Sequence, residues 1–324
     1  MKCKHIYIIL YILVLILPFI FIRCKDIVEE DLSEETVTLL APANGLQTET
    51  LTHNFWWDPV DGADRYNLQI VEPSFSAIES LVMDTNLSDI QFQYTLDPGS
   101  YEWGVSGYNS TSATPYTVFV LQIDSTPDLS GQEVVLESPS DNKATSDSLI
   151  TFKWYELYNA EDYRLEIRTP DWDGQGAINP QIIDGTEYTV YLEENFYTWG
   201  IQAQNSTSGS SFTTRDLIVD RTAPNKPVLL EPDDEEVIND STLTNSTITF
   251  QWKRGMNSGS AIHDSLYLYS DSTLTVLEYS EYLSDTVFSY EMDEAGDYYW
   301  FVRSIDAADN ESEYSSVFEF IYEE

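Results

Sequence analysis

One pattern of aromatic residues occurs three times along the chain, and this repetition limits the fold more than any other feature. Segment 150–168 (ITFKWYELYNAEDYRLEIR) matches segment 53–71 (HNFWWDPVDGADRYNLQIV) with each shared residue displaced by 97 positions. A third copy opens with ITFQW at 248–252, and each copy continues to a second signature: YEWGV, YTWGI or YYWFV. The tryptophans of the two signatures are 46, 45 and 48 residues apart. This regularity predicts three modules of about 95 residues each.

Within each module, apolar and polar residues alternate with a period of two. Phe152 and Trp154 point to one side of a strand, and Tyr163, Leu165 and Ile167 share a face of the next. Turn-forming Asp, Asn and Gly residues separate these runs, and helical periodicity is absent from all three modules. Short strands with frequent turns favour an all-β fold in which each module is a β-sandwich.

The stretch WDPVDGADRYNLQI, followed by LDPGSYEWGVSGYN at 96–109, resembles the fibronectin type III module, a seven-strand immunoglobulin-like sandwich. The resemblance implies that Trp57 lies on strand B, Tyr66 on strand C and Tyr101 at a tyrosine corner, where a phenol caps a backbone group. It covers modules at 36–125, 132–221 and 226–324, and it specifies a fold rather than a function. The core residues that it implies are Trp57, Tyr66, Tyr101, Trp103, Trp154, Tyr163, Tyr197, Trp199, Trp252, Tyr298 and Trp300.

Copy three departs most from this pattern, because its B–C connection is a longer Gly- and Ser-rich insert at 254–264. The linkers 123–139 and 219–232 contain prolines, which fix φ and remove donors. We therefore expect three tandem sandwiches in a semi-rigid rod, which is a stalk.

The first 23 residues are typical of a targeting segment. Lys2 and Lys4 precede an uninterrupted apolar run at 6–22, and Cys24 follows it after Arg23. This arrangement resembles the signal peptide of bacterial lipoproteins, in which the cysteine is lipidated and becomes residue one after cleavage. Arg23 departs from the small residue that the family has before this cysteine. The alternative is an uncleaved signal anchor.

Residues 24–35 are expected to form an acidic tether. Glu29, Glu30 and Asp31 resemble the acidic surface-export signal of some Gram-negative lipoproteins. The resemblance implies an outer-membrane protein held by a lipid anchor, exposed on the cell surface of a Gram-negative bacterium. Its partners would be the membrane, and another surface protein or a glycan.

Charge excludes one class of partner. The chain has 56 acidic and 15 basic residues, for a formal net charge of −41, so it repels phosphate backbones and should not bind nucleic acid. The 22 Tyr, 14 Phe and 8 Trp residues indicate a folded chain rather than a disordered acidic one.

Catalysis finds little support in the residue types. Beyond the targeting segment the chain has two histidines and, past Cys24, no cysteine, so we expect no enzymatic activity, no catalytic residue and no cofactor. The same shortage argues against a His-based metal site. Two stretches are weak calcium candidates because oxygen ligands alternate there, although ordinary Asp/Asn/Gly turns have the same composition. Their carboxylates are Asp171, Asp173, Asp306 and Asp309.

Three aromatic residues outside the core pattern are candidate ligand contacts. Trp56 neighbours a core tryptophan, so strand alternation turns it outward; Phe75 and Trp172 are 97 residues apart and should share the loop after strand C. Exposed rings beside carboxylates and amides can stack on sugars, whereas the alternative is that they cover the sandwich.

Two functions follow from these features. The first is a non-enzymatic, lipid-anchored adhesion or scaffold protein that binds other proteins through sheet edges and loops. The alternative is a glycan-binding accessory lipoprotein, similar in layout to those of outer-membrane polysaccharide-uptake systems.

Overall fold

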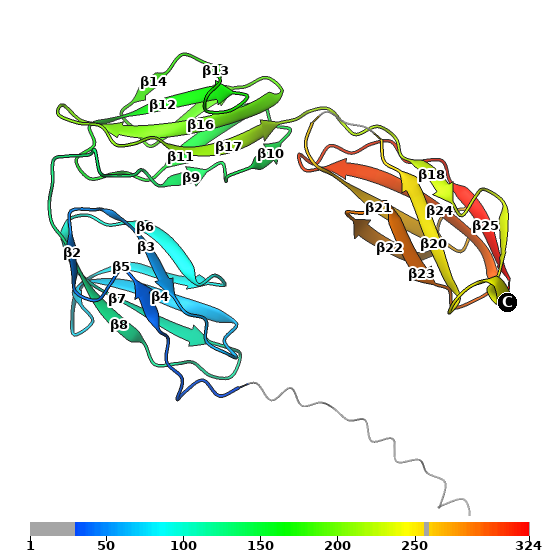
Figure 1. The fold of residues 1–324 in the computed structure, drawn as a ribbon, viewed down its shortest axis with the longest axis horizontal. Helices are drawn as coiled ribbons and strands as arrows, with labels where there is room; N and C mark the ends of the chain where they lie inside the picture. The colour runs from blue at the N-terminus through cyan, green and yellow to red at the C-terminus, as the bar shows by residue number, and fades with distance from the viewer. Residues whose placement is uncertain (1–29, 256–258, 324) are drawn as a thin grey trace, which may run out of the picture.

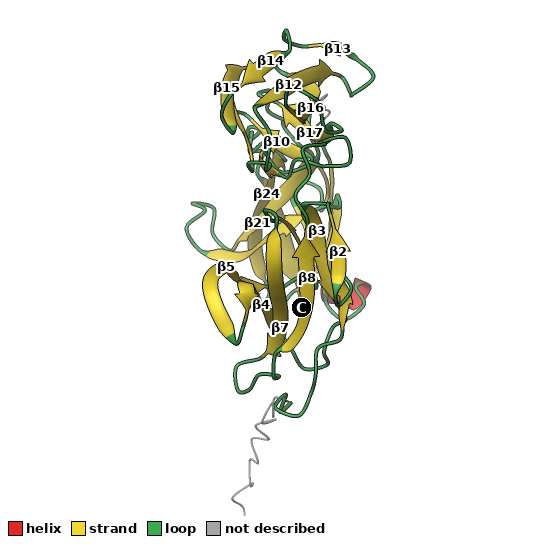
Figure 2. Cartoon of the chain, turned by 90° about the vertical axis from the view of Figure 1, so that its left-hand side faces the viewer, coloured by secondary structure: helices red, strands yellow, loops and turns green. Residues whose placement is uncertain are grey.

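The computed structural model describes residues 30–255 and 259–323, which form three β-sandwiches in chain order (Figure 1). The predicted targeting segment and Cys24 lie outside the described residues. Figure 2 shows strands and loops throughout, with a single turn of 3-10 helix, η1 (Asp240–Thr242). In the described part of the chain, no helix has the length and apolar character needed to cross a membrane.

Module 1 packs a three-stranded sheet against a five-stranded sheet. The first has the order β1-β3-β6 and the second the order β2-β8-β7-β4-β5. The strands are β1 (Leu39–Ala41), β2 (Leu46–Thr48), β3 (Thr52–Trp57), β4 (Arg65–Ser74), β5 (Ala77–Leu87), β6 (Gln91–Thr95), β7 (Gly99–Tyr108) and β8 (Thr117–Ile123).

Module 2 repeats this arrangement, with sheets β15-β11-β9 and β10-β17-β16-β12-β13, and β14 also pairs with β12. The strands are β9 (Leu136–Ser138), β10 (Lys143–Thr145), β11 (Leu149–Trp154), β12 (Asp162–Thr169), β13 (Gln175–Gly176), β14 (Gln181–Ile183), β15 (Glu187–Tyr191), β16 (Asn195–Gln204) and β17 (Thr213–Val219).

Module 3 has the sheets β18-β20-β23 and β19-β25-β24-β21-β22. Its strands are β18 (Val228–Glu231), β19 (Glu236–Asn239), β20 (Thr247–Lys253), β21 (Ile262–Tyr269), β22 (Leu277–Leu283), β23 (Val287–Glu291), β24 (Gly296–Asp306) and β25 (Phe318–Glu323).

In every module the first strand splits between the two sheets. Its first half (β1, β9 or β18) pairs antiparallel with strand B (β3, β11 or β20). Its second half (β2, β10 or β19) pairs parallel with the last strand of the other sheet (β8, β17 or β25). The prediction of an all-β chain with three tandem fibronectin type III-like sandwiches is confirmed.

The repeated tryptophans fill the space between the sheets. Each exposes at most 2% of its surface: Trp57, Trp103, Trp154, Trp199, Trp252 and Trp300. A phenylalanine from strand B packs on the tryptophan of strand F (β7, β16 or β24), with ring centroids 4.8–5.1 Å apart in all three modules. Such large buried rings dominate the apolar area that each small sandwich removes from water.

A tyrosine corner recurs in each module. The phenol of the tyrosine near the start of strand F donates a hydrogen bond to the backbone carbonyl four residues upstream. The pairs are Tyr101 with Asp97 (2.9 Å), Tyr197 with Glu193 (2.8 Å) and Tyr298 with Glu294 (2.7 Å).

The start of strand C (β4, β12 or β21) differs between the copies. Tyr66 and Tyr163 accept a hydrogen bond from a backbone N–H of the preceding loop, at 2.9 and 2.8 Å. Module 3 has Asp264 at the corresponding place, fully buried. Its carboxylate accepts hydrogen bonds from Trp252 Nε1 (2.8 Å), Arg254 Nε (2.8 Å) and the hydroxyl of Ser304 (2.6 Å). A buried polar network therefore replaces the tyrosine of the other two modules.

Two predicted boundaries are wrong. Residues 30–35, assigned to the acidic tether, pack on module 1: Leu32 is fully buried, and its N–H donates to Ser112 Oγ (2.9 Å). Residues 126–131, assigned to a linker, pack on module 2 in the same way, because Leu129 is fully buried and its N–H donates to Ser208 Oγ (2.8 Å). Modules 1 and 2 thus begin several residues earlier than predicted.

The first joint is held by a buried glutamine. Gln132, 4% exposed, donates from Nε2 to the Glu49 carbonyl (2.9 Å) and accepts from the Leu51 N–H (3.0 Å). The buried apolar residues of modules 1 and 2 form one continuous cluster, whereas those of module 3 form another. Apolar packing is therefore continuous across the first joint, whereas the second joint is bridged by hydrogen bonds from Ser260 and Asn310 to the buried Asp220.

We predict that Asp264→Ala lowers the free energy of unfolding of module 3 by about 3–5 kcal/mol, because it leaves the buried indole N–H of Trp252 and the charge of Arg254 without their partner. Urea titration followed by tryptophan fluorescence measures the change. Asp285→Ala, which removes an exposed carboxylate, is the matched control and should cost less than about 0.5 kcal/mol. Equal effects of the two substitutions would contradict the role of the buried network.

Candidate functional site

The structure separates the three predicted ligand-contact aromatics. Trp56 lies on the outer face of the sheet β1-β3-β6 and is 45% exposed. Phe75 and Trp172 share the predicted position, directly after strand C, and both are half-buried. They belong to different modules, so the three rings do not form one site.

Phe75 and Trp172 cover a glycine on strand F of their own module. A side chain at Gly200 would place its Cβ 2.7 Å from Trp172 Cη2, and one at Gly104 would lie 3.5 Å from Phe75 Cε2. Trp172 also packs on Phe212, with centroids 5.1 Å apart. These two rings therefore fill the space above a glycine, as expected if they cover the sandwich.

Charged groups hold Trp172 in place. The Arg168 guanidinium lies 4.7 Å from the centre of the indole ring and donates to the Trp172 carbonyl (3.0 Å). Arg168 and Arg164 both pair with Glu166, at 2.7 and 2.5 Å. Burial alone would raise the pKa of the Glu166 carboxyl, but its hydrogen bonds and the two arginines outweigh burial and lower it.

Module 3 covers the same face of strand F with a different residue. Where modules 1 and 2 have a glycine after the strand F tryptophan, module 3 has Phe301, whose own ring covers the sheet. Phe301 stacks on Tyr267 (5.1 Å) and packs against the edge of Tyr314 (5.2 Å). The aromatic cover on this face is thus common to all three copies, which favours a structural role.

Two of the four calcium candidates, Asp306 and Asp171, accept hydrogen bonds within their own turns. Asp306 is buried and accepts from the N–H groups of Ala308 and Asn310, both at 2.9 Å. Asp171 accepts from the N–H of Asp173 (3.0 Å). Within 30–255 and 259–323, no group of three or more His, Cys, Asp or Glu side chains is arranged to hold a metal ion.

A concave site lies where modules 1 and 2 meet. This cleft has a volume of about 1290 Å³ and is lined by strands β5 and β6 of module 1 and by the loop between β11 and β12 of module 2. Its aromatic lining residues are Phe92, Tyr94, Tyr101, Tyr155 and Tyr158, and its carboxylates are Glu72, Asp97, Glu137 and Glu156.

Two tyrosines at the cleft are particular to module 2. Tyr155 and Tyr158 are 49% and 37% exposed, whereas the corresponding residues of module 1 are Asp58 and Asp61. The core residue between the two tyrosines, Leu157, is buried. Exposed rings that the shared core pattern does not require, placed at a cleft, are the strongest indication of a ligand site in the described part of the chain.

The cleft is acidic, and the pKa values of two of its phenols are raised. Burial raises the pKa of Tyr94, with Asp97 and Tyr155 adding to the effect, and burial together with Glu72, Asp97 and Tyr94 raises the pKa of Tyr101 to about 12. The cationic lining residue, Arg215, donates to the carbonyls of Leu136 (2.6 Å), Glu137 (3.1 Å) and Pro139 (2.9 Å). Neutral or cationic ligands therefore fit this site better than anionic ones.

Sequence reasoning did not identify the cleft, because its two halves come from different modules. The signal that could have indicated it is the pair of tyrosines in the module 2 loop, which break the repeat where the core pattern leaves the residue type open.

No protein family model matches the sequence, and no curated protein does. Among solved structures, the FN1–FN3 domains of chicken CNTN1 are similar at 12% identity, covering 89% of this chain and 97% of that chain, with a TM-score of 0.40. The fibronectin(III)-like modules of Clostridium thermocellum CbhA are also 12% identical, covering 59% of this chain and 94% of that chain, with a TM-score of 0.36.

We predict that Trp172→Ala lowers the stability of module 2 by about 2 kcal/mol, because it removes an aromatic pair and a cation–π contact. Trp56→Ala, on the open outer face, is the matched control and should cost less than about 0.5 kcal/mol. Gly200→Ala should destabilise the intact protein by displacing the indole, and cost less in a Trp172→Ala background, where only the close contact with Thr214 Cγ2 (2.9 Å) remains. Chemical denaturation of the four variants measures this coupling, and additive effects would refute the covering role.

Proposed function

We propose that this protein is a non-enzymatic stalk on the cell surface that binds another surface protein through the cleft between modules 1 and 2. The observation that carries the proposal is the pair of exposed tyrosines, Tyr155 and Tyr158, at a cleft whose two walls are joined by the buried Gln132. A preorganised cleft loses less conformational entropy on binding than a flexible pair of modules would.

Tandem sandwiches suit a scaffold because each further module lengthens the stalk without requiring a catalytic site. Anchoring at Cys24 would place module 1 next to the membrane, since residue 30 already packs on that module. Stable anchoring would require more than one acyl chain, because a single chain binds membranes only marginally. The outer leaflet of a Gram-negative outer membrane is the location that best fits the predicted export signal.

A photo-crosslinking residue in place of Tyr155, in the native host, tests the protein-binding proposal. We expect a discrete adduct with one surface protein. The same residue in place of Tyr191 is the control, because that tyrosine is 52% exposed on module 2 and is not among the cleft residues. The proposal fails if position 155 gives no adduct, or if both positions give the same adducts.

A glycan is the alternative ligand, favoured by tyrosine rings next to carboxylates and amides such as Gln91, Gln93 and Asn159. Tyr155→Ala combined with Tyr158→Ala should weaken binding of a neutral polysaccharide about tenfold by removing ring stacking. Affinity electrophoresis in gels containing dextran, xylan or soluble starch measures the change. Trp56→Ala serves as the control, and unaltered migration of the unmodified protein in all three gels would dismiss the glycan.

The mass of the mature N-terminal peptide, taken from the membrane fraction of the native host, tests the anchor. We expect a peptide that begins at an acylated Cys24 despite Arg23. A peptide that still begins at Met1 would mean an uncleaved inner-membrane anchor. The modules would then face the periplasm, and a surface partner would no longer be reasonable.

A further inference from the structure

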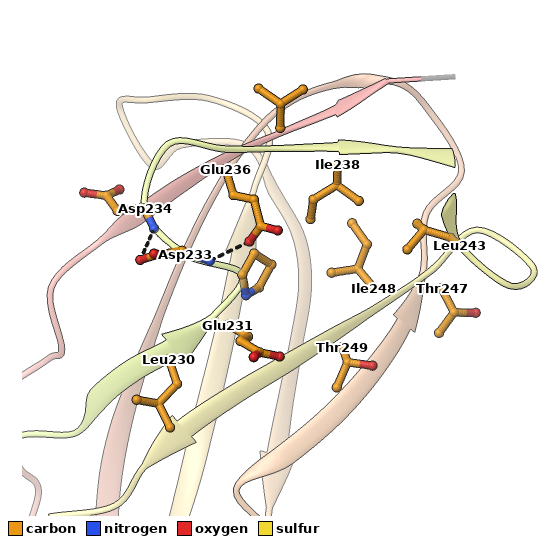
Figure 3. A pocket seen from close by; sticks show the side chains of 12 residues that line it. Leu230, Glu231, Asp233, Asp234, Glu236, Ile238, Leu243, Thr247, Ile248 and Thr249 are labelled. Carbon is orange, nitrogen blue, oxygen red and sulfur yellow. Dashed lines mark hydrogen bonds between the residues drawn. The ribbon is translucent and has the colours of Figure 1, made fainter. Parts of the chain in front are cut away.

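Module 3 has a groove between two strand edges that lack a partner on one side. In the described residues, β18 pairs only with β20, and β19 pairs only with β25. The groove between them has a volume of about 720 Å³. Figure 3 shows Ile238 of β19 and Ile248 of β20 in the gap between the strands.

The floor of the groove belongs to the core of module 3. Ile248 is 2% exposed, and Ile238 and Leu243 are partly buried side chains that pack against the core. The strand register places Ile238 opposite Tyr322, where modules 1 and 2 have Thr48 and Thr145. The apolar residue at this place is therefore particular to module 3.

The first two modules close this region with a short turn. Thr48 Oγ1 accepts from the Thr50 N–H (3.0 Å), and strand B begins at Thr52. In module 3 the connection from β19 to β20 is longer and contains η1, so Leu243 lines the groove instead. A shared turn has thus been replaced by an apolar recess.

The rim of the groove is acidic. Its lining residues include Glu231, Asp233, Asp234 and Glu236, and no Lys or Arg. Three of these carboxylates also accept hydrogen bonds from the backbone: Glu236 from the Asp233 N–H (2.8 Å), Asp233 from the Asp234 N–H (2.9 Å) and Asp234 from the Glu319 N–H (3.0 Å). The remaining negative charge favours a cationic ligand over an anionic one.

We propose that this groove binds an extended segment of a partner protein in which aliphatic residues alternate with lysine or arginine. The segment adds as a further strand beside β19, along the edge that pairs with no other strand and beyond Glu236, whose N–H already donates to the Asp233 carbonyl (3.2 Å). Its aliphatic side chains enter the recess and its cations face the rim. A second copy of this chain is a poor occupant, because both molecules would bring a net charge of −41. This site is independent of the cleft between modules 1 and 2.

The probe is a fluorescein-labelled peptide of alternating lysine and valine, titrated with the full chain in detergent and followed by anisotropy. Glu231→Lys should weaken binding about tenfold by reversing a rim charge. Ile238→Thr, which introduces the residue of modules 1 and 2, should weaken it several-fold by removing the apolar recess. Asp285→Lys, at an exposed position between β22 and β23 that does not line the groove, is the matched control and should leave affinity unchanged.

Two further peptides separate the contributions. A glutamate–valine peptide should not bind, and a lysine–serine peptide should bind much more weakly than lysine–valine. Equal binding of the lysine–valine and lysine–serine peptides would overturn the proposal, because it would show attraction by charge alone. Equal weakening by Glu231→Lys and Asp285→Lys, or no binding of the lysine–valine peptide, would also overturn it. Thermal unfolding of each variant verifies that the fold is retained.

Discussion

The joint between modules 1 and 2 depends on one buried amide. Gln132 satisfies a carbonyl and an N–H of module 1 while its own backbone belongs to the segment that packs on module 2. A buried amide with unpaired groups would cost several kcal/mol, so the joint is stable only in a geometry that keeps both bonds. The cleft follows from this constraint, because its walls are β6 on one side and the β11–β12 loop on the other. A flexible linker of the same length would leave the tyrosines without a fixed opposite wall.

The copies show which parts of the sandwich tolerate change. Phe301 replaces a glycine and the ring that covers it, and Asp264 replaces a tyrosine together with its hydrogen bond to the loop. Each change is compensated by its surroundings: Tyr267 and Tyr314 pack on Phe301, and Arg254 pairs with Asp264 at 2.8 Å. The inward tryptophans and the tyrosine corners are kept in all three modules, because they close the two sheets on each other.

The sequence could predict the fold because the core residues repeat with a period that only paired strands explain. Alternation identified the faces of the strands, and the spacing of Trp57 and Trp103 identified the module. It could not predict that residues 30–35 pack on module 1, because their composition is that of a tether and the decisive contact is a single leucine, Leu32, 80 positions from its partner Ser112. The sequence could not predict the cleft for a related reason. Its lining residues come from segments that no local pattern connects.

Departures from the repeat, rather than the repeat itself, mark the places where binding is plausible in physical terms. A residue that all copies share is explained by the sandwich that they share, as with the rings above Gly104 and Gly200. When an exposed residue occurs in only one of the three copies, the shared sandwich does not explain it. Tyr155 in module 2 satisfies this criterion fully, and Ile238 in module 3 satisfies it in part, because it also packs on the core. Both are in acidic surroundings, so the protein's negative charge selects against anionic ligands at the two sites alike.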